Sequence, residues 1–387
     1  MKKDGMWKSL TAKPGFSSLV ASLISILCGL VIGLILLFFF NAGAAFSGFR
    51  NLVSSGFSSS AKLAKVLYQA APLIMTGLSV GFAFKTGLFN IGATGQYTMG
   101  TFFALVCALQ FQLPWWICLL AAMIGGAFWG LFPGLFKATS NVNEVITSIM
   151  FNWIALFVVN FSINNMPKML ATYWGASNSD RTGALGAANP SAMIPKLGLD
   201  KLMDSNYINI SIFIAILFAI AMWVILTKTT FGYELRACGN NRNASIYAGI
   251  NAKRNIVLSM VIAGALSGIG GGLYYLAGTA QYTLVKSLLS AGFNGIPVAL
   301  LATSHPIGTI FSALFISYIQ VGGDAMQPEF VKEIIDIIVA VIIYLSAFAL
   351  LMHEMIDRKM LKRDDRNVNA ESAPAVSTPS ESEAQSK

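Results

Sequence analysis

The chain of 387 residues is much more apolar than a soluble protein, since 55% of its residues are hydrophobic and only 11% are charged, against about 25% charged residues in an ordinary soluble domain. This composition excludes a soluble globular fold, and long runs without a charged residue, such as the one between Lys85 and Lys137, exclude a β-barrel, whose strands are short and alternate in polarity. A net charge of +9 does not indicate nucleic-acid binding, because most basic residues fall in loops and tails, where they set the orientation of a membrane protein.

Ten segments are predicted to cross the membrane as helices, because a bilayer needs about 20 apolar residues per helix. The first follows a basic N-terminus but is too long for a signal peptide, so it is expected to be retained. In chain order the ten segments are 16–40, 63–84, 87–111, 113–136, 145–162, 208–226, 256–277, 287–303, 306–321 and 334–352. Turn residues at 112–114 (QLP) and 304–306 (SHP) separate neighbouring segments, whereas residues 85–86 alone separate the second from the third.

The lysines and arginines predict that both termini lie in the cytoplasm. With the N-terminus inside, its lysines, the loop at 227–255 and the basic residues at 358–363 all face the cytoplasm, as positive residues usually do. Arg50, Lys62 and Lys65 fall on the external side, against this trend. Ten spans, an even number, return the C-terminus to the cytoplasm.

These considerations divide the chain into a cytoplasmic N-terminal segment (1–15), a transmembrane domain (16–352) and a cytoplasmic tail (353–387). The tail has too few apolar residues to bury from about residue 367 onward and is expected to be disordered there. Within the transmembrane domain, a polar segment rich in Asn, Ser, Gly and Pro at 164–206 is expected outside the cell, and the loop at 227–255 inside it.

The internal loop is expected to contain a short helix. Asn243 is a candidate N-cap and Gly249 a candidate stop for a helix of one or two turns, which would lie across the cytoplasmic face. The residues alone leave two interpretations open. The loop is either a docking surface for a partner or a solvated segment whose basic residues signal topology.

A faint internal repeat relates the two halves of the chain. GLFNIG at Gly87 resembles AGFNGI at Ala291, and NEVITSIM at Asn143 resembles KEIIDIIV at Lys332. The third and fifth spans would then mirror the eighth and tenth, which predicts an inverted-repeat core around a central pathway. Chance similarity is the alternative.

Two helix faces carry glycine at every fourth position, a spacing that lets helices approach closely in a membrane. These faces consist of Gly126, Gly130 and Gly134, and of Gly264, Gly268 and Gly272. We expect them to pack helices of this chain together rather than to form a dimer.

Five amides fall inside the apolar spans: Gln69, Asn90, Gln96, Asn152 and Asn294. An unpaired polar group in hydrocarbon is costly, so each bonds to a neighbouring helix or faces a wet cavity, and the structural role is favoured for any single amide. Asn90 and Asn294 stand out because each follows a phenylalanine in a glycine-interrupted segment, which suits a ligand with a flat ring and hydrogen-bonding edges. The predicted substrate pathway comprises Phe89, Asn90, Gln96, Asn152, Phe293 and Asn294.

The sequence carries no signature of catalysis, metal binding or ATP hydrolysis. It has two histidines, no carboxylate cluster within the spans, and four cysteines without metal-ligand spacing, which are expected to be free thiols. No span centre holds an ionisable residue of the kind that ion-coupled carriers use, since Glu144 and Asp336 lie at span mouths. A Walker-type phosphate loop is absent. A transporter of this kind would depend on another subunit for energy.

Four stretches together resemble a known family: GLFNIGATGQYTMG (87–100), NVNEVITSIMFNWIA (141–155), FGYELRACGNNRNASIYAGI (231–250) and GFNGIPVALLATSHPIG (292–308). They are similar to the permease subunits of bacterial ABC importers for nucleosides, within a wider group that also moves simple sugars such as ribose and, more distantly, branched-chain amino acids. The resemblance covers most of residues 63–350. It implies a non-catalytic, multi-pass subunit of the bacterial cell membrane that imports nucleosides by alternating access.

The resemblance also implies partner chains. A separate ATPase subunit would bind ATP and Mg, an extracellular binding protein, often a lipoprotein, would deliver the substrate, and a second, different permease would pair with this one. The long external segment suggests that this chain is the larger of the two permeases, and it would hold no cofactor itself. The residues implied in coupling to the ATPase are Phe231, Gly232, Tyr233, Glu234, Arg236, Gly239, Asn243 and Gly249. The loop departs from the general docking consensus of importers, because its glycine follows Glu234 by five residues rather than six.

Other functions compete with nucleoside import. The shared motifs also fit a simple sugar such as ribose as the substrate of the same architecture. From a different class comes an autonomous ion-coupled secondary carrier, which would work without an ATPase partner. An enzyme embedded in the membrane has the least support from the residues.

Overall fold

The computed structural model describes residues 14–347. Over this range the chain is all-α, as predicted, with two isolated β-bridges and no strand. The predicted tail at 353–387, including the part expected to be disordered, lies outside the described residues, as do residues 1–13 and the end of the tenth predicted span. The cytoplasmic location of the termini stays a prediction.

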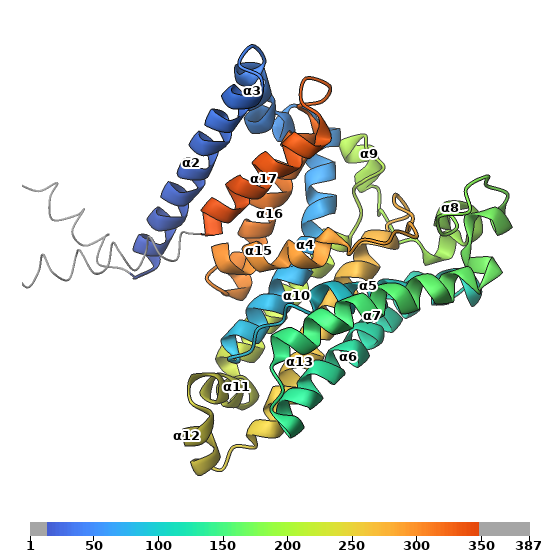
Figure 1. Cartoon of the computed structure of the whole chain (residues 1–387). Helices are drawn as coiled ribbons and strands as arrows, with labels where there is room; N and C mark the ends of the chain where they lie inside the picture. Colours follow the sequence, from blue (N-terminus) through green and yellow to red (C-terminus); the bar gives the residue numbers. More distant parts are fainter. Residues whose placement is uncertain (1–13, 348–387) are drawn as a thin grey trace, which may run out of the picture.

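Figure 1 shows the helices in their spatial arrangement, with α3 at one end of the bundle and α12 at the other. Their bounds are α2 (Pro14–Phe40), α3 (Ala45–Ser54), α4 (Ser60–Lys85), α5 (Ala93–Leu105), α6 (Trp115–Ser140), α7 (Glu144–Asn164), α8 (Leu185–Ala188), α9 (Leu199–Met203), α10 (Ser211–Lys228), α11 (Thr230–Asn240), α12 (Arg242–Tyr247), α13 (Ala252–Tyr275), α14 (Ser290–Phe293), α15 (Gly295–Leu301), α16 (Pro306–Asp324) and α17 (Lys332–Ala347). A π-helical turn, Val106–Gln110, extends α5.

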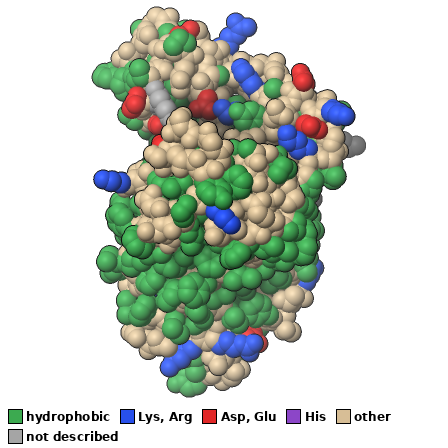
Figure 2. Space-filling model, turned by 90° about the vertical axis from the view of Figure 1, so that its right-hand side faces the viewer, with side chains coloured by type: hydrophobic (Ala, Val, Ile, Leu, Met, Phe, Trp, Pro, Cys, Tyr) green, Lys and Arg blue, Asp and Glu red, His purple; other side chains and the backbone are tan. Residues whose placement is uncertain are grey.

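Among the described residues, six helices are long and apolar enough to cross a membrane: α4, α6, α7, α10, α13 and α16. Shorter apolar helices at Leu27–Phe40 and Ser290–Leu301 accompany them. Figure 2 shows a band of hydrophobic side chains across the middle of the molecule, with charged side chains gathered above and below it. The prediction of a polytopic α-helical membrane protein is therefore confirmed.

The third and eighth predicted spans are wrong as continuous helices. The third begins with residues 87–92, which are not helical, because α4 ends in a Schellman motif in which Leu88 N–H donates to Ala83 O at 2.9 Å and Gly87 takes a positive φ of 76°. The eighth divides into α14 and α15 at Asn294. Pro297 has no N–H to donate back to the preceding turn, so it weakens the helix at this break.

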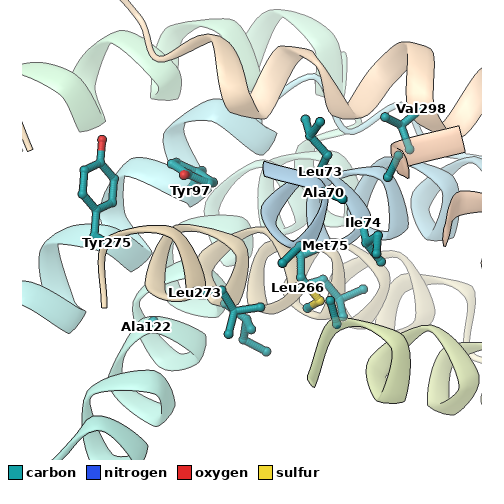
Figure 3. Packing of buried hydrophobic residues seen from close by; sticks show 14 of the residues in the cluster. Ala70, Leu73, Ile74, Met75, Tyr97, Ala122, Leu266, Leu273, Tyr275 and Val298 are labelled. Carbon is teal, nitrogen blue, oxygen red and sulfur yellow. The ribbon is translucent and has the colours of Figure 1, made fainter. Parts of the chain in front are cut away.

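Helices α4 and α13 form the centre of the bundle. Of their most apolar stretches, 89% and 72% of the residues are buried, compared with 33% for α6 and for α10. Met75 of α4 and Leu266 and Leu273 of α13 belong to one hydrophobic cluster, which Figure 3 shows from close by. A helix surrounded in this way by other helices can carry polar side chains that never meet lipid.

The glycine faces pack helices of the same chain together, as predicted. At Gly126 the place of a Cβ is filled by the backbone of Gly264 and Gly268, and at Gly130 it is filled by the backbone of Met260 and Gly264. Because any side chain would meet backbone atoms there, α6 and α13 can approach this closely only with glycine at these positions.

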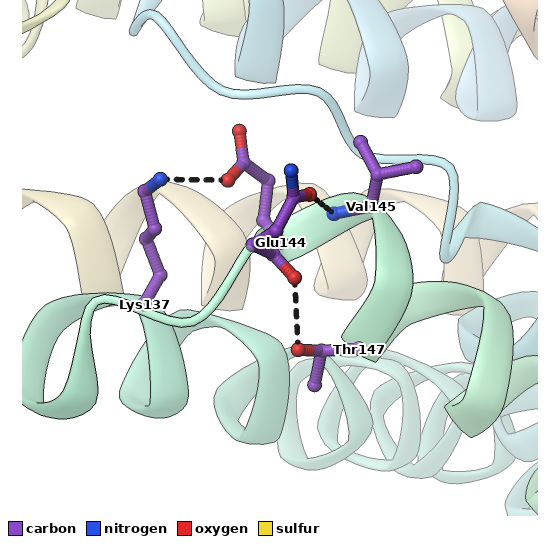
Figure 4. Close-up of polar contacts among 5 residues, drawn as sticks. Lys137, Glu144, Val145 and Thr147 are labelled. Carbon is purple, nitrogen blue, oxygen red and sulfur yellow. Dashed lines mark hydrogen bonds and ion pairs between the residues drawn. The ribbon is translucent and has the colours of Figure 1, made fainter.

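The turn between α6 and α7 pairs the carboxylate of Glu144, which lies at a predicted span mouth, with a lysine. Glu144 Oε2 is 2.9 Å from Lys137 Nζ. Asn143 caps α7, since its side chain accepts a hydrogen bond from the Val145 N–H at 2.8 Å and its carbonyl accepts one from the Thr147 hydroxyl at 3.0 Å (Figure 4). Glu144 thus has its counter-charge within the turn.

The polar segment that precedes α10 is folded against the bundle. It contains α8, α9 and three short 3₁₀ turns, and it buries Met169, Leu185 and Ile194. The Thr182 N–H donates to Tyr282 O at 2.9 Å, which ties the segment to the chain that follows α13. Residues 165–210 therefore form a structured cap at the end of the bundle opposite α11 and α12 (Figure 1).

Candidate functional site

The bundle contains a cavity of about 640 Å³ between α4, α5, α13, α14, α16 and α17, within the roughly 300–1,000 Å³ of small-molecule sites. It lies in the half of the bundle predicted to face outside. Its lining consists of Gln69, Pro72, Leu73, Tyr97, Tyr274, Tyr275, Leu289, Ser290, Ala291, Asn294, Gln320, Asp324, Ile335, Asp336, Val339 and Ala340.

Part of the cavity lining is aromatic. Tyr97 of α5 and Tyr274 and Tyr275 of α13 border it. Tyr274 stacks on Tyr68 of α4, with ring centroids 5.1 Å apart and planes at 23°, and the Tyr68 hydroxyl donates to the Tyr274 carbonyl at 3.0 Å. These contacts hold α4 and α13 together beside the cavity. Aromatic rings placed in this way can stack on a flat ligand.

The polar part of the lining carries two carboxylates with different environments. Asp324 Oδ2 lies 2.8 Å from Lys65 Nζ, so its charge is paired. Asp336 makes no hydrogen bond or ion pair with the residues that the structure describes, and these residues contribute no Lys or Arg to the lining. Gln69 Oε1 is buried and also lacks a partner. The cavity therefore offers free acceptors from α17 and from α4.

Asn294 is the predicted pathway residue that lines this cavity. It is half-buried at the break between α14 and α15, and the preceding Phe293 is half-buried as well. The neighbouring Gly292 packs against the backbone of Thr94 in α5, and Gly295 packs against Thr76 in α4. The broken helix thus lies against α4 and α5, where a glycine on each side of the break permits the contact.

Asn90 and Gln96 form a buried pair away from the cavity lining. Asn90 Nδ2 donates to Gln96 Oε1 at 2.7 Å and to Ser79 Oγ at 2.9 Å, while Gln96 Nε2 donates to Asn90 Oδ1 at 3.0 Å. The side chains are 0% and 1% exposed. The pair ties the non-helical connection at 87–92 to α4 and to the first turn of α5.

Asn152 of α7 holds the same connection from the other side. Its Oδ1 accepts a hydrogen bond from the Gly95 N–H at 2.8 Å, and its Nδ2 donates to Ile91 O at 3.0 Å. Phe89 stacks on Phe84, with centroids 5.1 Å apart. These side chains supply hydrogen bonds that a buried, irregular backbone needs inside a membrane. Their part in a substrate pathway stays a prediction.

Sequence reasoning missed several residues that line the cavity. The predicted pathway does not include the tyrosines of α5 and α13, and the position of Asp336 near a span mouth argues against it in the sequence. A usable signal was present, because Asp336 interrupts the apolar run IIDIIVAV, and an ionisable residue within a membrane helix is a candidate for function.

The internal loop forms two helices, α11 and α12, at the predicted cytoplasmic end. The prediction that Asn243 caps the short helix is wrong, because α12 begins at Arg242 and the side chain of Asn241 accepts the Ala244 N–H at 3.0 Å. Asn241 takes the extended backbone conformation that an N-cap needs. Gly249 follows the helix with a φ of +83°, as its predicted stopping role requires. Asn243 itself is exposed on α12.

The remaining coupling residues lie on α11. Gly232 is buried against the backbone of α10, Phe231 packs against the core, and Tyr233 is 65% exposed. Glu234 Oε2 accepts a hydrogen bond from Asn255 at 3.3 Å, and Arg236 Nε donates to the Gly232 carbonyl at 3.4 Å. A hollow of about 480 Å³ separates α11 from α12. Coupling by these residues stays a prediction.

Comparisons with known proteins identify relatives over most of the chain. The family model described as branched-chain amino acid transport system / permease component matches residues 62–347. The chain is 36% identical to the nucleoside ABC transporter permease protein NupB of Lactococcus lactis, covering 87% of this chain and 92% of the relative. It is also 36% identical to the guanosine ABC transporter permease protein NupP of Bacillus subtilis, covering 86% and 93%.

A more distant relative has a different named substrate. The glucose ABC transporter permease protein TsgB13 of Haloferax volcanii is 29% identical over 74% of this chain and 77% of its own length. No solved structure matches the chain. The apolar spans and the relatives describe a multi-pass protein of the bacterial plasma membrane. The chain belongs to the family of branched-chain amino acid transport system permease components.

Proposed function

We propose that the chain is the membrane-spanning subunit of an ATP-driven importer that takes up nucleosides. The observation that carries this proposal is the cavity between α4, α5, α13, α14, α16 and α17, which combines aromatic rings with amides and carboxylates. A nucleoside has a flat base and several hydrogen-bonding groups, so it matches such a lining. The names of the two relatives at 36% identity support the same substrate class.

Energy for transport would come from a partner. In this proposal a separate ATPase subunit binds ATP and Mg and docks on α11 and α12, while this chain holds no cofactor and performs no catalysis. Ile246 and Tyr247 on α12 are 53% and 93% exposed, which supports a contact with another chain, because exposed apolar side chains at the end of a bundle gain stability when they are covered. An extracellular binding protein and a second permease subunit would complete the transporter.

A simple sugar is the second candidate substrate, favoured by the relative named as a glucose permease. Amides, carboxylates and tyrosines also suit a sugar, since hydroxyl groups bond to the polar atoms and a pyranose face packs on an aromatic ring. Both candidates share the same architecture and the same dependence on an ATPase. An autonomous ion-coupled carrier would differ from both by working without that partner.

Uptake by intact cells tests the proposal. Radiolabelled guanosine and uridine are offered to cells with and without the gene, in a strain without other nucleoside carriers, and challenged with excess unlabelled nucleosides, nucleobases, glucose or ribose. We expect uptake that requires both this gene and the ATPase gene and that only nucleosides block. Uptake of a sugar instead would overturn the substrate, and uptake without the ATPase gene would overturn the mechanism.

A further inference from the structure

One face of α17 presents a single polar side chain to the cavity. Ile335, Asp336, Val339 and Ala340 line it together, at the spacing of one helix face. The carboxylate of Asp336 therefore stands among apolar neighbours on its own helix. This carboxylate is exposed, so a ligand that enters the cavity can reach its oxygens.

The described residues supply no partner for it. The other carboxylate of the lining, Asp324, has Lys65 at 2.8 Å, whereas Asp336 has neither an ion pair nor a hydrogen bond, and the described lining includes no cation. A second acceptor in the same cavity, Gln69 Oε1, is buried and unpartnered. The cavity thus has unused acceptors on two helices, α4 and α17.

We propose that Asp336 recognises an uncharged nucleoside by accepting hydrogen bonds from two adjacent donors, with Gln69 Oε1 as a further acceptor. This inference rests on the proposed function and adds the residues that select the substrate. A carboxylate has two oxygens that can receive a pair of parallel donors. A phosphorylated ligand would be repelled, because its negative charge would meet Asp336 in a cavity whose described lining holds no cation.

Two parts of a nucleoside offer a suitable pair of donors. The ribose 2′- and 3′-hydroxyls form one pair, and the N1–H and 2-amino groups of guanine form the other. Analogues separate them, since 2′-deoxyguanosine lacks a donor of the first pair and inosine lacks a donor of the second. Aromatic stacking on the tyrosines of the cavity is available to all three compounds.

The test uses the complete transporter and compares wild type with Asp336→Asn, which keeps the shape of the side chain and removes its charge. Initial uptake of guanosine, inosine and 2′-deoxyguanosine is measured at saturating concentration, with the amount of transporter in the membrane determined by immunoblot. The binding protein is the same in both strains, so the ratio of variant to wild-type uptake for each nucleoside reports on the membrane subunit. Glu333→Gln, an exposed charge on the same helix, serves as the matched control.

We expect Asp336→Asn to lower guanosine uptake about tenfold or more, the size of a lost charged hydrogen bond. If Asp336 recognises the base edge, the loss of uptake should be markedly smaller for inosine than for guanosine. If it recognises the ribose, the loss should be markedly smaller for 2′-deoxyguanosine. Glu333→Gln should leave all three ratios near one. Equal ratios for the three nucleosides, whether reduced or unchanged, would overturn the inference.

Two further observations keep the test decisive. If Asp336→Asn does not accumulate in the membrane, Asp336→Glu keeps the charge but moves the oxygens by one methylene, and it should again change the three ratios unequally. A wild-type transporter that imports no nucleoside would refute the proposed function itself, whereas import with equal ratios would refute the role of Asp336 alone.

Discussion

Gly87 and Gly239 lie backbone against backbone. A Cβ on Gly87 would stand 2.6 Å from the Cα of Gly239, and a Cβ on Gly239 would stand 2.7 Å from the N of Gly87. Gly87 begins the non-helical connection between α4 and α5, and Gly239 lies in the last turn of α11. The loop that we propose docks on the ATPase therefore touches the segment that Asn90 and Asn152 hold. In that proposal a movement of α11 would be passed directly into the bundle.

Gly239→Ala is expected to disturb this contact. The added methyl group would meet backbone atoms of Thr86 and Gly87, and overpacking of this kind costs about 1–3 kcal/mol. We expect a lower thermal unfolding temperature in detergent and reduced nucleoside uptake by the complete transporter. Gly186→Ala is the control, because the nearest atom to its Cβ is Met193 Sδ at 3.8 Å. Wild-type stability and uptake in Gly239→Ala would show that the contact has room to relax.

Tyr247→Ala should weaken the association with the ATPase without destabilising the fold of this chain. The side chain is 93% exposed, so its removal should change the stability of this chain by less than about 0.5 kcal/mol. If α12 docks on the ATPase, the same change removes an aromatic anchor and should weaken binding by about 1 kcal/mol or more. Co-purification of the two subunits measures this effect. Leu202→Ala on α9, which is 79% exposed at the opposite end, should leave the association unchanged, and equal association of both variants would argue against docking through α12.

Asn152→Ala is expected to destabilise the connection between α4 and α5. The change removes the acceptor of the Gly95 N–H and the donor to the Ile91 carbonyl, which leaves two backbone groups unpaired at a buried site and costs about 2–4 kcal/mol. Thermal unfolding in detergent measures the loss. Asn164→Ala, at the exposed end of the same helix, should be nearly neutral. A stable Asn152→Ala with altered substrate preference would instead assign this amide to the pathway.

The cap that His305 forms at the start of α16 predicts that the stability of the protein depends on pH. Its Nδ1 accepts a hydrogen bond from the Gly308 N–H at 3.4 Å, which requires the neutral imidazole. Burial, with a smaller contribution from the charge of Lys85, lowers the pKa of His305 in the folded protein. A lowered histidine pKa means that the unfolded chain takes up the proton first, so this stabilisation is present above about pH 6.5 and is lost as the pH falls through the lower, folded-state pKa.

Unfolding temperatures between about pH 5 and pH 8 check this expectation. Wild type should lose stability toward the acid end relative to His305→Asn, which keeps a capping acceptor but does not titrate. His305→Ala should be less stable than His305→Asn at every pH, by about 1 kcal/mol. A constant difference between wild type and His305→Asn over the range would contradict a titrating cap.

Much of the fold follows from local sequence. The length of the apolar segments predicts the long spans, because a chain in hydrocarbon must pair its own backbone hydrogen-bonding groups, and a helix does so within one segment. The glycine spacing of α6 and α13 predicts their close packing for a similar reason, since only glycine allows two backbones to meet. The breaks at Gly87 and Asn294 lie in segments that contain several glycines, but composition does not distinguish a bent helix from an interrupted one.

The candidate site depended on tertiary structure. In the sequence Asn90 and Asn294 share the same local pattern, an amide after a phenylalanine, yet the fold pairs Asn90 with Gln96 and places Asn294 on the cavity. The two carboxylates of the cavity differ in the same way. Asp324 pairs with Lys65, which is 259 residues away, while Asp336 pairs with no cation in the part of the chain that the structure describes. The sequence alone indicates which segments are apolar enough to enter a membrane, since this depends on the chemistry of each segment, but it does not show whether such a segment is one continuous helix. Which polar groups are left free follows from the fold, because hydrogen bonds and ion pairs are satisfied by residues that folding brings together from distant parts of the chain.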